Sequence, residues 1–184
     1  MVDDSSHETS AIDFFNEATV KCESLNKIRN RTSRGVARSL MLGFNHLYSM
    51  GCDVLINLDN DTIVSTLFFK SLIDLHEKFP NEIVSGFDTR TEDFKSKTQR
   101  HKIISEHDDY VVKASIGGIN LCFSRYTYAN RIRYSLMAHK NWDWLMSKKI
   151  GRFIISTPSV VQHTGIYQGM HTDNPDLAFN FKPF

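Results

Sequence analysis

In the first third of the chain, one segment has apolar residues at a helical period, and a short apolar run follows it directly. Apolar residues recur at intervals of four and three between Gly35 and Met50, which predicts an amphipathic helix that Gly51 ends. The next segment, Asp53–Leu58, is a short apolar run followed by turn-forming residues, and it is typical of a buried strand. The pattern therefore predicts a helix that leads into a strand of a buried sheet.

The same alternation continues on both sides of this strand. Thr62 or Ser65 is expected to cap a second helix with an apolar face, which Pro80 ends. The other expected helices are 7–18, 124–138 and 141–149, and the other expected strands are 18–25, 83–87, 110–123, 153–156 and 160–161. Strands that alternate with helices predict a three-layer α/β/α sandwich with a mostly parallel central sheet.

Three segments depart from this pattern. Residues 2–6 resemble the end of a strand that runs into a polar loop, so the first strand is expected to be shortened. Residues 88–110 are polar and without periodicity, which indicates a surface excursion that includes a hairpin. Gly117 and Gly118 interrupt an otherwise strand-like segment, as glycines do at a bulge or where a ligand approaches the backbone.

Composition narrows the class of protein. A chain of 184 residues with 41% hydrophobic content suits one compact domain over 1–184. The formal net charge is +1, so no global field recruits nucleic acid or a membrane surface. Cys22, Cys52 and Cys122 are widely spaced and are expected to be reduced, and no membrane span or signal peptide is recognisable. A cytoplasmic protein is the resulting expectation.

The turn after the strand expected at Asp53–Leu58 carries the first chemical signal. Asp59 and Asp61 are one residue apart at the end of an apolar run, where two unpaired carboxylates would be costly to bury. A divalent cation explains both, because hard cations take oxygen ligands and bridge to phosphates. A solvated turn is the alternative interpretation, since Asp and Asn favour turns.

Six motifs, in order along the chain, resemble the nucleotide-sugar glycosyltransferases of the GT-A type. They are DDSS (3–6), the basic segment and helix of 30–50, LDND (58–61), GGINLCFSR (117–125), NWDW (141–144) and PSVVQHTG (158–165). The resemblance implies a Rossmann-like GT-A fold with a nucleotide-binding half at 1–87 and an acceptor-binding and catalytic half at 88–184. The near-absent first strand and an NWDW without the usual Glu-Asp pair depart from the family pattern.

The resemblance also implies a metal site. LDND is similar to the metal-binding Asp-X-Asp of the family, with Asp61 expected to bind the ion directly and Asp59 to act through water or the ribose hydroxyls. His163 follows an apolar strand and is the expected imidazole ligand, although a lone histidine there is otherwise structural. Carboxylate and phosphate ligands suit Mn²⁺ or Mg²⁺, and the imidazole favours Mn²⁺.

Asp143 lies between the two tryptophans of the chain, Trp142 and Trp144. A carboxylate there can accept the proton of an acceptor hydroxyl, and aromatic faces suit sugar rings. Gly117 and Gly118 resemble the family segment beneath the donor and acceptor sugars. The alternative interpretation is that the tryptophans anchor a helix and Asp143 caps its start.

The nucleotide is expected to lie over the first half of the chain. The resemblance assigns Asp3 and Asp4 to the nucleobase and ribose, and Asn60 joins Asp59 beside the nucleotide. Arg34 or Arg38, at the start of the first long helix, is within the region expected to reach the phosphates. His171 is the candidate for a lid over the diphosphate.

The sequence thus predicts a metal-dependent glycosyltransferase that moves a sugar from a UDP-linked donor to a glycan, protein or small-molecule hydroxyl acceptor, with inversion. One alternative is an inactive glycosyltransferase-like domain that binds nucleotide or glycan. Another is a metal-dependent phosphoester hydrolase, which would need more acids around a metal pair.

Overall fold

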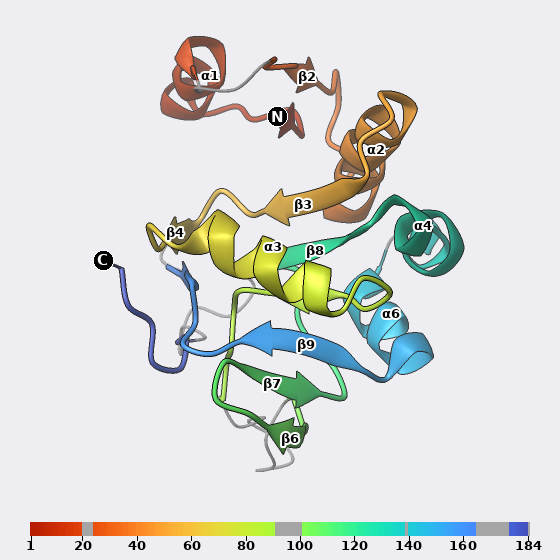
Figure 1. Ribbon diagram of the computed structural model, residues 1–184. Coiled ribbons are helices and arrows are strands. Elements are labelled where there is room, and N and C mark those ends of the chain that lie inside the picture. The colour runs from red at the N-terminus through yellow and green to blue at the C-terminus, as the bar shows by residue number, and fades with distance from the viewer. Residues whose placement is uncertain (20–23, 91–100, 139, 165–176, 184) are drawn as a thin grey trace.

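The computed structural model describes residues 1–19, 24–90, 101–138, 140–164 and 177–183 (Figure 1). The strands are β1 (Val2–Asp3), β2 (Ile28–Arg29), β3 (Val54–Leu58), β4 (Thr62–Val64), β5 (Val84–Ser85), β6 (Ile103–Glu106), β7 (Tyr110–Lys113), β8 (Asn120–Ser124), β9 (Phe153–Ser156) and β10 (Val161–His163). The helices are α1 (Thr9–Glu17), α2 (Val36–Ser49), α3 (Phe68–Lys78), α4 (Arg125–Thr127), the π-helical turn η1 (Tyr128–Ile132), α5 (Arg133–Met137) and α6 (Trp142–Ile150).

A six-stranded sheet with the order β3-β8-β5-β9-β7-β6 forms the centre of the fold (Figure 1). The pairings give β3, β5, β9 and β6 one direction and β8 and β7 the other, so most strands point the same way, as predicted. Only β5 and β9 are neighbours in parallel, because β8 and β7 insert between strands of the common direction. The α/β class is confirmed, and the sheet is mixed in its pairing.

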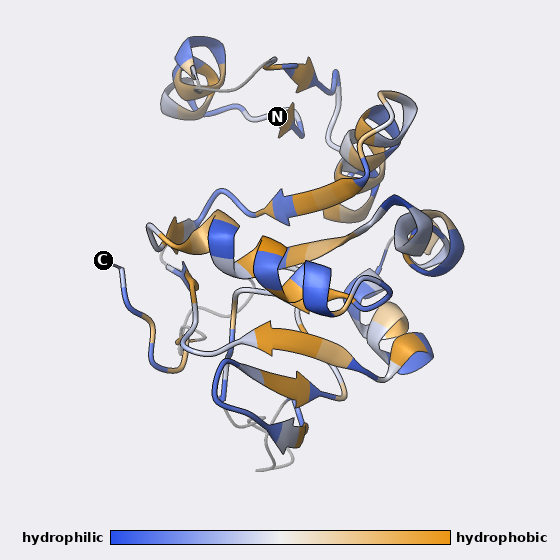
Figure 2. Ribbon diagram, in the orientation of Figure 1, coloured by the Kyte–Doolittle hydropathy of each residue, from blue (hydrophilic) through white to orange (hydrophobic). Residues whose placement is uncertain are grey.

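Two apolar cores lie on opposite faces of this sheet, which gives the predicted three layers. Phe153 and Ile155 of β9 belong to the core under α2, α5 and α6, while Ile154 between them belongs to the core under α3. Strands buried on both faces are continuous apolar runs in sequence, as β9 is in Figure 2.

The end of α2 agrees with the prediction from sequence, whereas the start of α3 does not. Gly51 follows α2 with φ 84°, a left-handed conformation that glycine adopts without strain, so it ends the helix as predicted. Neither Thr62 nor Ser65 is the N-cap of α3: Thr62 lies in β4, and the cap position is Leu67. The Ser65 hydroxyl instead accepts a hydrogen bond from the Leu67 amide at 3.2 Å, just ahead of the helix.

The N-terminal segment differs from prediction in one strand. Helix α1 falls within the expected 7–18, but the described part of 18–25 contains no strand. The strand is β2, a few residues later in the basic segment, because it pairs in parallel with β1. Each of these strands has two residues, so the first strand is as short as predicted.

Most of the remaining expectations are met. Hairpin β6–β7 lies in and just after the 88–110 excursion, of which 91–100 are outside the described residues. Gly117 and Gly118 precede β8 and do not interrupt a strand.

Cys52 and Cys122 are free thiols, and burial raises the pKa of Cys122 to about 12. Cys22 is outside the described residues. In the described part of the chain, no helix combines the length and the apolar character that crossing a membrane requires.

Candidate functional site

The end of β3 places the two aspartates of LDND in a fixed turn. The Asp59 amide donates to the carbonyl of Ile119 at 3.0 Å, and the Thr62 hydroxyl donates to the Asp59 carbonyl at 2.6 Å. Strand β4 then starts directly after Asp61. The turn is therefore held at both ends by hydrogen bonds that do not use either carboxylate.

The pairing of β4 with β10 brings His163 to Asp61. These strands are antiparallel, with Thr62 opposite His163. His163 Nε2 lies 2.9 Å from Asp61 Oδ2, and both side chains are partly exposed. Thr164 donates to the Asp61 carbonyl from both its amide and its hydroxyl, each at 2.8 Å. The structure thus brings together two residues that are far apart in the sequence and that were expected to share one ion.

The pKa of the Asp59 carboxyl is strongly raised by its surroundings. Burial is the largest cause, followed by the charges of Asp61 and Asp143, and together they raise the pKa of Asp59 to about 7. Asp143 is therefore close enough for its charge to act on Asp59, although it belongs to α6, far along the chain. The structure thus brings Asp61 and His163 into contact just after β3, and the charges of Asp61 and Asp143 act on the carboxyl of Asp59.

Asp61 and His163 can supply some, but not all, of the ligands of a divalent cation. No three His, Cys, Asp or Glu side chains among the described residues are arranged to enclose a metal ion by themselves. The Asp61–His163 pair nevertheless offers a carboxylate oxygen and an imidazole nitrogen, and buried Nδ1 of His163 has no hydrogen-bond partner in the described structure. Such a pair leaves room for phosphate and water as the remaining ligands, which is how Mg²⁺ and Mn²⁺ are commonly held with phosphorylated substrates.

The raised pKa of Asp59 predicts a pH-dependent stability. Because the folded-state pKa of about 7 exceeds the unfolded value of 3.8, the folded protein binds more protons than the unfolded chain between these values. Stability from this group is complete below pH 4 and is lost as the pH rises through 7. We expect Asp59→Asn to be more stable than the wild type at pH 8 without metal, by roughly 4 kcal/mol, because each pKa unit corresponds to about 1.4 kcal/mol. At pH 4 the two proteins should have nearly the same stability. Urea denaturation at the two pH values measures this, and identical profiles for both proteins would contradict it.

The segment NWDW forms the start of α6, and its two tryptophans have different surroundings. Trp142 is 6% exposed and belongs to the core, whereas Trp144 is 59% exposed. A Cβ added to Gly118 would lie 2.3 Å from Trp142 Cζ2, so only glycine allows this ring to pack there. Trp142 thus anchors the helix, and Trp144 is the tryptophan with a face available to a sugar. Asp143 accepts a hydrogen bond from the Trp144 amide at 2.8 Å, so it also supports the first turn of α6.

The residues predicted to bind the nucleotide are engaged with the protein itself. The Asp4 carboxylate accepts hydrogen bonds from the amides of Arg34 and Gly35 and from three side chains, those of Asn30, Ser33 and Ser39, all between 2.8 and 3.1 Å. Partial burial acts to raise the pKa of Asp4, but these bonds outweigh it and hold the pKa at about 2. Asp4 therefore fixes the loop before α2.

The Asp3 carboxylate also interacts within the protein: it forms an ion pair with Arg29 at 3.0 Å and accepts a hydrogen bond from the Ser6 hydroxyl. The main-chain amide of Arg34 donates a hydrogen bond to Asp4. Arg34 and Asn60 are both exposed. A Cβ added to Gly117 would meet no atom within 4 Å, apart from its chain neighbours. His171, the candidate lid residue, is outside the described residues.

Two buried features were missed in the sequence. Asn57 and Asn120 are 7% and 0% exposed and form a hydrogen-bonded pair beside the site. Lys113 is 1% exposed and forms an ion pair with Asp88, which is fully buried. The signal for the first was present, because Asn57 is a polar residue in the middle of the apolar run of β3.

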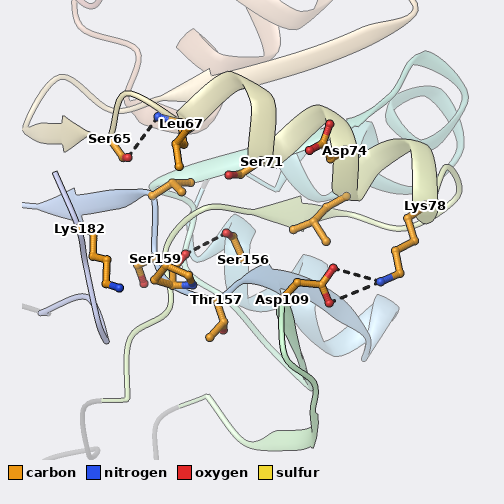
Figure 3. Close-up of a pocket in the computed structure, with 13 residues that line it drawn as sticks. Ser65, Leu67, Ser71, Asp74, Lys78, Asp109, Ser156, Thr157, Ser159 and Lys182 are labelled. Atoms are coloured by element: carbon orange, nitrogen blue, oxygen red, sulfur yellow. Dashed lines mark hydrogen bonds and ion pairs between the residues drawn. The ribbon is translucent and has the colours of Figure 1, made fainter. Parts of the chain in front are cut away.

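A pocket of about 330 Å³ lies apart from these residues, between α3 and the turn that joins β9 to β10 (Figure 3). The hydroxyls of Ser71 and Ser156 and the ion pair of Lys78 with Asp109 line it. None of the residues predicted for metal, nucleotide or sugar contributes to its lining. The candidate site is therefore the cluster at the end of β3.

Comparison with known proteins supports the fold. No family model matches the chain, and neither does any curated protein. The crystal structure of GalNAc-T7 with UDP, GalNAc and Mn²⁺ is similar with a TM-score of 0.62 and 14% identity, over 88% of this chain and 36% of that one. Mannose-1-phosphate geranyltransferase from Thermus thermophilus aligns with a TM-score of 0.49 and 11% identity, over 73% of this chain and 53% of that one.

A third solved structure, A197 from STIV, aligns with a TM-score of 0.47 and 13% identity, over 86% of this chain and 83% of that one. At these identities the likeness to GalNAc-T7 shows the fold alone, and this fold is the GT-A nucleotide-sugar transferase fold that the sequence motifs predicted. The chain spans about a third of the length of GalNAc-T7 and about half that of the geranyltransferase.

Proposed function

We propose that this chain carries the site of a metal-dependent glycosyltransferase, which moves a sugar from a UDP-linked donor to a hydroxyl acceptor with inversion. The observation that carries the proposal is the contact of His163 with Asp61 at 2.9 Å, beside an Asp59 whose pKa is raised by burial and by its neighbours. A carboxylate and an imidazole that converge next to a further carboxylate are suited to a cation bound with a diphosphate. The fold supports the proposal, since GalNAc-T7 was crystallised with UDP, GalNAc and Mn²⁺.

Asp61 and His163 would hold the ion, which is Mn²⁺ or Mg²⁺. When bound, a divalent ion supplies charge neutralisation for the diphosphate leaving group without a proton transfer. The charge of Asp61 acts on Asp59, which in the proposal binds through water or the ribose hydroxyls. Its proton is lost near neutral pH, so it is available as an anion in the presence of a cation.

Asp143 is the proposed general base. A carboxylate within hydrogen-bond reach of an acceptor hydroxyl can take its proton as the sugar is transferred. The charge of Asp143 acts on Asp59, which supports this role, and exposed Trp144 follows it with a face for a sugar ring. The acceptor would therefore approach over the start of α6.

One observation supports a non-enzymatic alternative, in which the domain binds nucleotide or glycan without transfer. The carboxylate of Asp4 is saturated by bonds within the protein. A phosphoester hydrolase finds less support, because the described residues provide no cluster for a metal pair.

Release of nucleotide from a panel of nucleotide sugars, with and without Mn²⁺, tests the proposal. We expect Mn²⁺-dependent release of UDP from at least one UDP-linked donor when an acceptor glycan, peptide or alcohol is present. Release of phosphate from simple phosphoesters would favour the hydrolase. Binding of UDP without any turnover would favour the non-enzymatic domain and would overturn the assignment of Asp143.

A further inference from the structure

Two buried asparagines connect the strands that carry the candidate site. Asn57 lies in β3, two residues before Asp59, and Asn120 begins β8. They are 7% and 0% exposed, in a part of the sheet that is otherwise apolar. A buried carboxamide is costly unless its donors and acceptor are used, so its partners indicate why it is there.

Each of the two side chains forms a hydrogen bond with the main chain of the strand that carries the other. Asn57 Oδ1 accepts from the amide of Leu121 at 2.9 Å, and Asn120 Nδ2 donates to the carbonyl of Asn57 at 2.7 Å. Each asparagine therefore bonds to the main chain of the other's strand. A carboxylate or an aliphatic side chain of similar size cannot make both kinds of bond.

Asn57 also holds the segment that precedes β8 and packs against the first residue of α6. Its Nδ2 donates to the carbonyl of Gly118 at 2.9 Å and to that of Ile119 at 3.3 Å. The Ile119 carbonyl accepts from the Asp59 amide as well, so this segment is tied to the LDND turn. Gly118 in turn lies against the ring of Trp142, the residue before Asp143.

Asn120 holds the segment that leads to His163. Its Oδ1 accepts from the amide of Gly86 at 2.8 Å. The Gly86 carbonyl accepts from the amides of Val160 and Val161 at 2.9 and 3.0 Å, and Val161 begins the strand that ends at His163. A Cβ at Gly86 would lie 2.6 Å from Val160 Cγ2, so this contact is close.

We propose that Asn57 and Asn120 are positioning residues, which set the places of the Asp59–Asp61 turn, of Asp143 and of His163 relative to one another. Apart from the two bonds that join β3 to β8, the hydrogen bonds of the pair lead to these three parts of the site. They lead through Ile119 to the turn, through Gly118 and Trp142 to Asp143, and through Gly86 to His163. The roles of these parts rest on the proposed function, whereas the placement itself is a property of the fold.

The test has two readouts. The first is the fluorescence of Trp142 in a chain carrying Trp144→Phe, where it is the only tryptophan because the sequence has two. The second is Mn²⁺-dependent UDP release in chains that keep Trp144. Asn57→Ala and Asn120→Ala are compared with Leu72→Ala, which creates a cavity in the core under α3 and controls for a general loss of stability.

We expect Asn57→Ala to shift the emission of Trp142 to longer wavelength, because Gly118 is released. We expect both asparagine variants to lower kcat about 100-fold with little change in KM for the donor, which is the cost of misplacing reacting groups by about 1 Å. Leu72→Ala is expected to change neither readout. Asn57→Ser replaces Asn57→Ala if the latter does not fold.

Asparagine variants that lower the melting temperature as the control does, yet keep the parent's emission and kcat, would overturn the inference. If the parent protein turns over no donor at all, the proposed function fails separately. The emission of Trp142 then decides the inference alone: a shift in Asn57→Ala upholds the placement, and an unchanged spectrum refutes it.

Discussion

Asp61→Ala is expected to lower Mn²⁺-dependent UDP release about 1,000-fold. Asp61 offers the only carboxylate in direct contact with His163 among the described residues, at 2.9 Å, and a bound cation contributes several kcal/mol to stabilising a leaving diphosphate. About 1.4 kcal/mol is tenfold in rate, which gives the expected factor. The substitution leaves the fold in place, because Thr164 bonds to the carbonyl of Asp61 and alanine keeps this atom.

Asp74→Ala is the matched control for this variant. Asp74 is an exposed carboxylate of α3, paired with Lys70 one turn away, and it takes no part in the site. It should retain full activity. An Asp61→Ala protein that releases UDP at the wild-type rate would show that the ion, if one is used, is held elsewhere.

Lys113→Met is expected to have the largest effect on stability, a loss of about 3–5 kcal/mol. Lys113 and Asp88 are 1% and 0% exposed and form an ion pair, and Lys113 also donates to the carbonyl of Thr89. Methionine preserves the volume but leaves the Asp88 carboxylate buried with only Arg90 as its charged partner among the described residues, at 3.2 Å. Removing one member of a buried pair costs about this much because the other charge stays in the interior. Urea denaturation measures the difference.

Lys78→Met provides the comparison for the buried pair. Lys78 and Asp109 form an ion pair whose side chains are 49% and 61% exposed, and an exposed pair contributes about 0–1 kcal/mol. The double variant Asp88→Asn, Lys113→Met should recover part of the loss, since it removes the uncompensated charge. Equal losses for Lys113→Met and Lys78→Met would contradict the role assigned to burial.

The parts of the fold that were predicted from sequence depend on local signals. The apolar run of β3, the periodicity of α2 and the glycine after it each specify an element within a few residues. The proximity of Asp61 to His163 was expected from motifs at the ends of two separate strands, and the structure places their side chains in contact. The α/β class follows from the order of such elements along the chain.

The elements that were missed depend on partners far along the chain. Strand β4 has three residues, two of them exposed, and it exists because it pairs with β10 about a hundred residues later. Strand β2 lies in a basic segment and exists because it pairs with β1. Neither has an apolar run that local pattern reading can detect.

The surroundings of side chains were harder to predict than elements. A motif assigns Asp4 to the nucleotide, but it gives no sign of the residues that bond to the Asp4 carboxylate, which come from positions 30 to 39 and are brought to it by the fold. Trp142 and Trp144 look alike in the sequence, and only the packing of one ring on Gly118 separates the buried anchor from the exposed face.

The central claim is that Asp61 and His163 hold one divalent ion together with a nucleotide diphosphate. Titration of the protein with Mn²⁺ in the presence of UDP, followed by the loss of the electron paramagnetic resonance signal of free Mn²⁺, measures this directly. We expect one bound Mn²⁺ per chain, which is lost in Asp61→Ala and in His163→Ala and kept in Asp74→Ala. Equal Mn²⁺ binding by all four proteins, or none by the wild type with UDP, would contradict it.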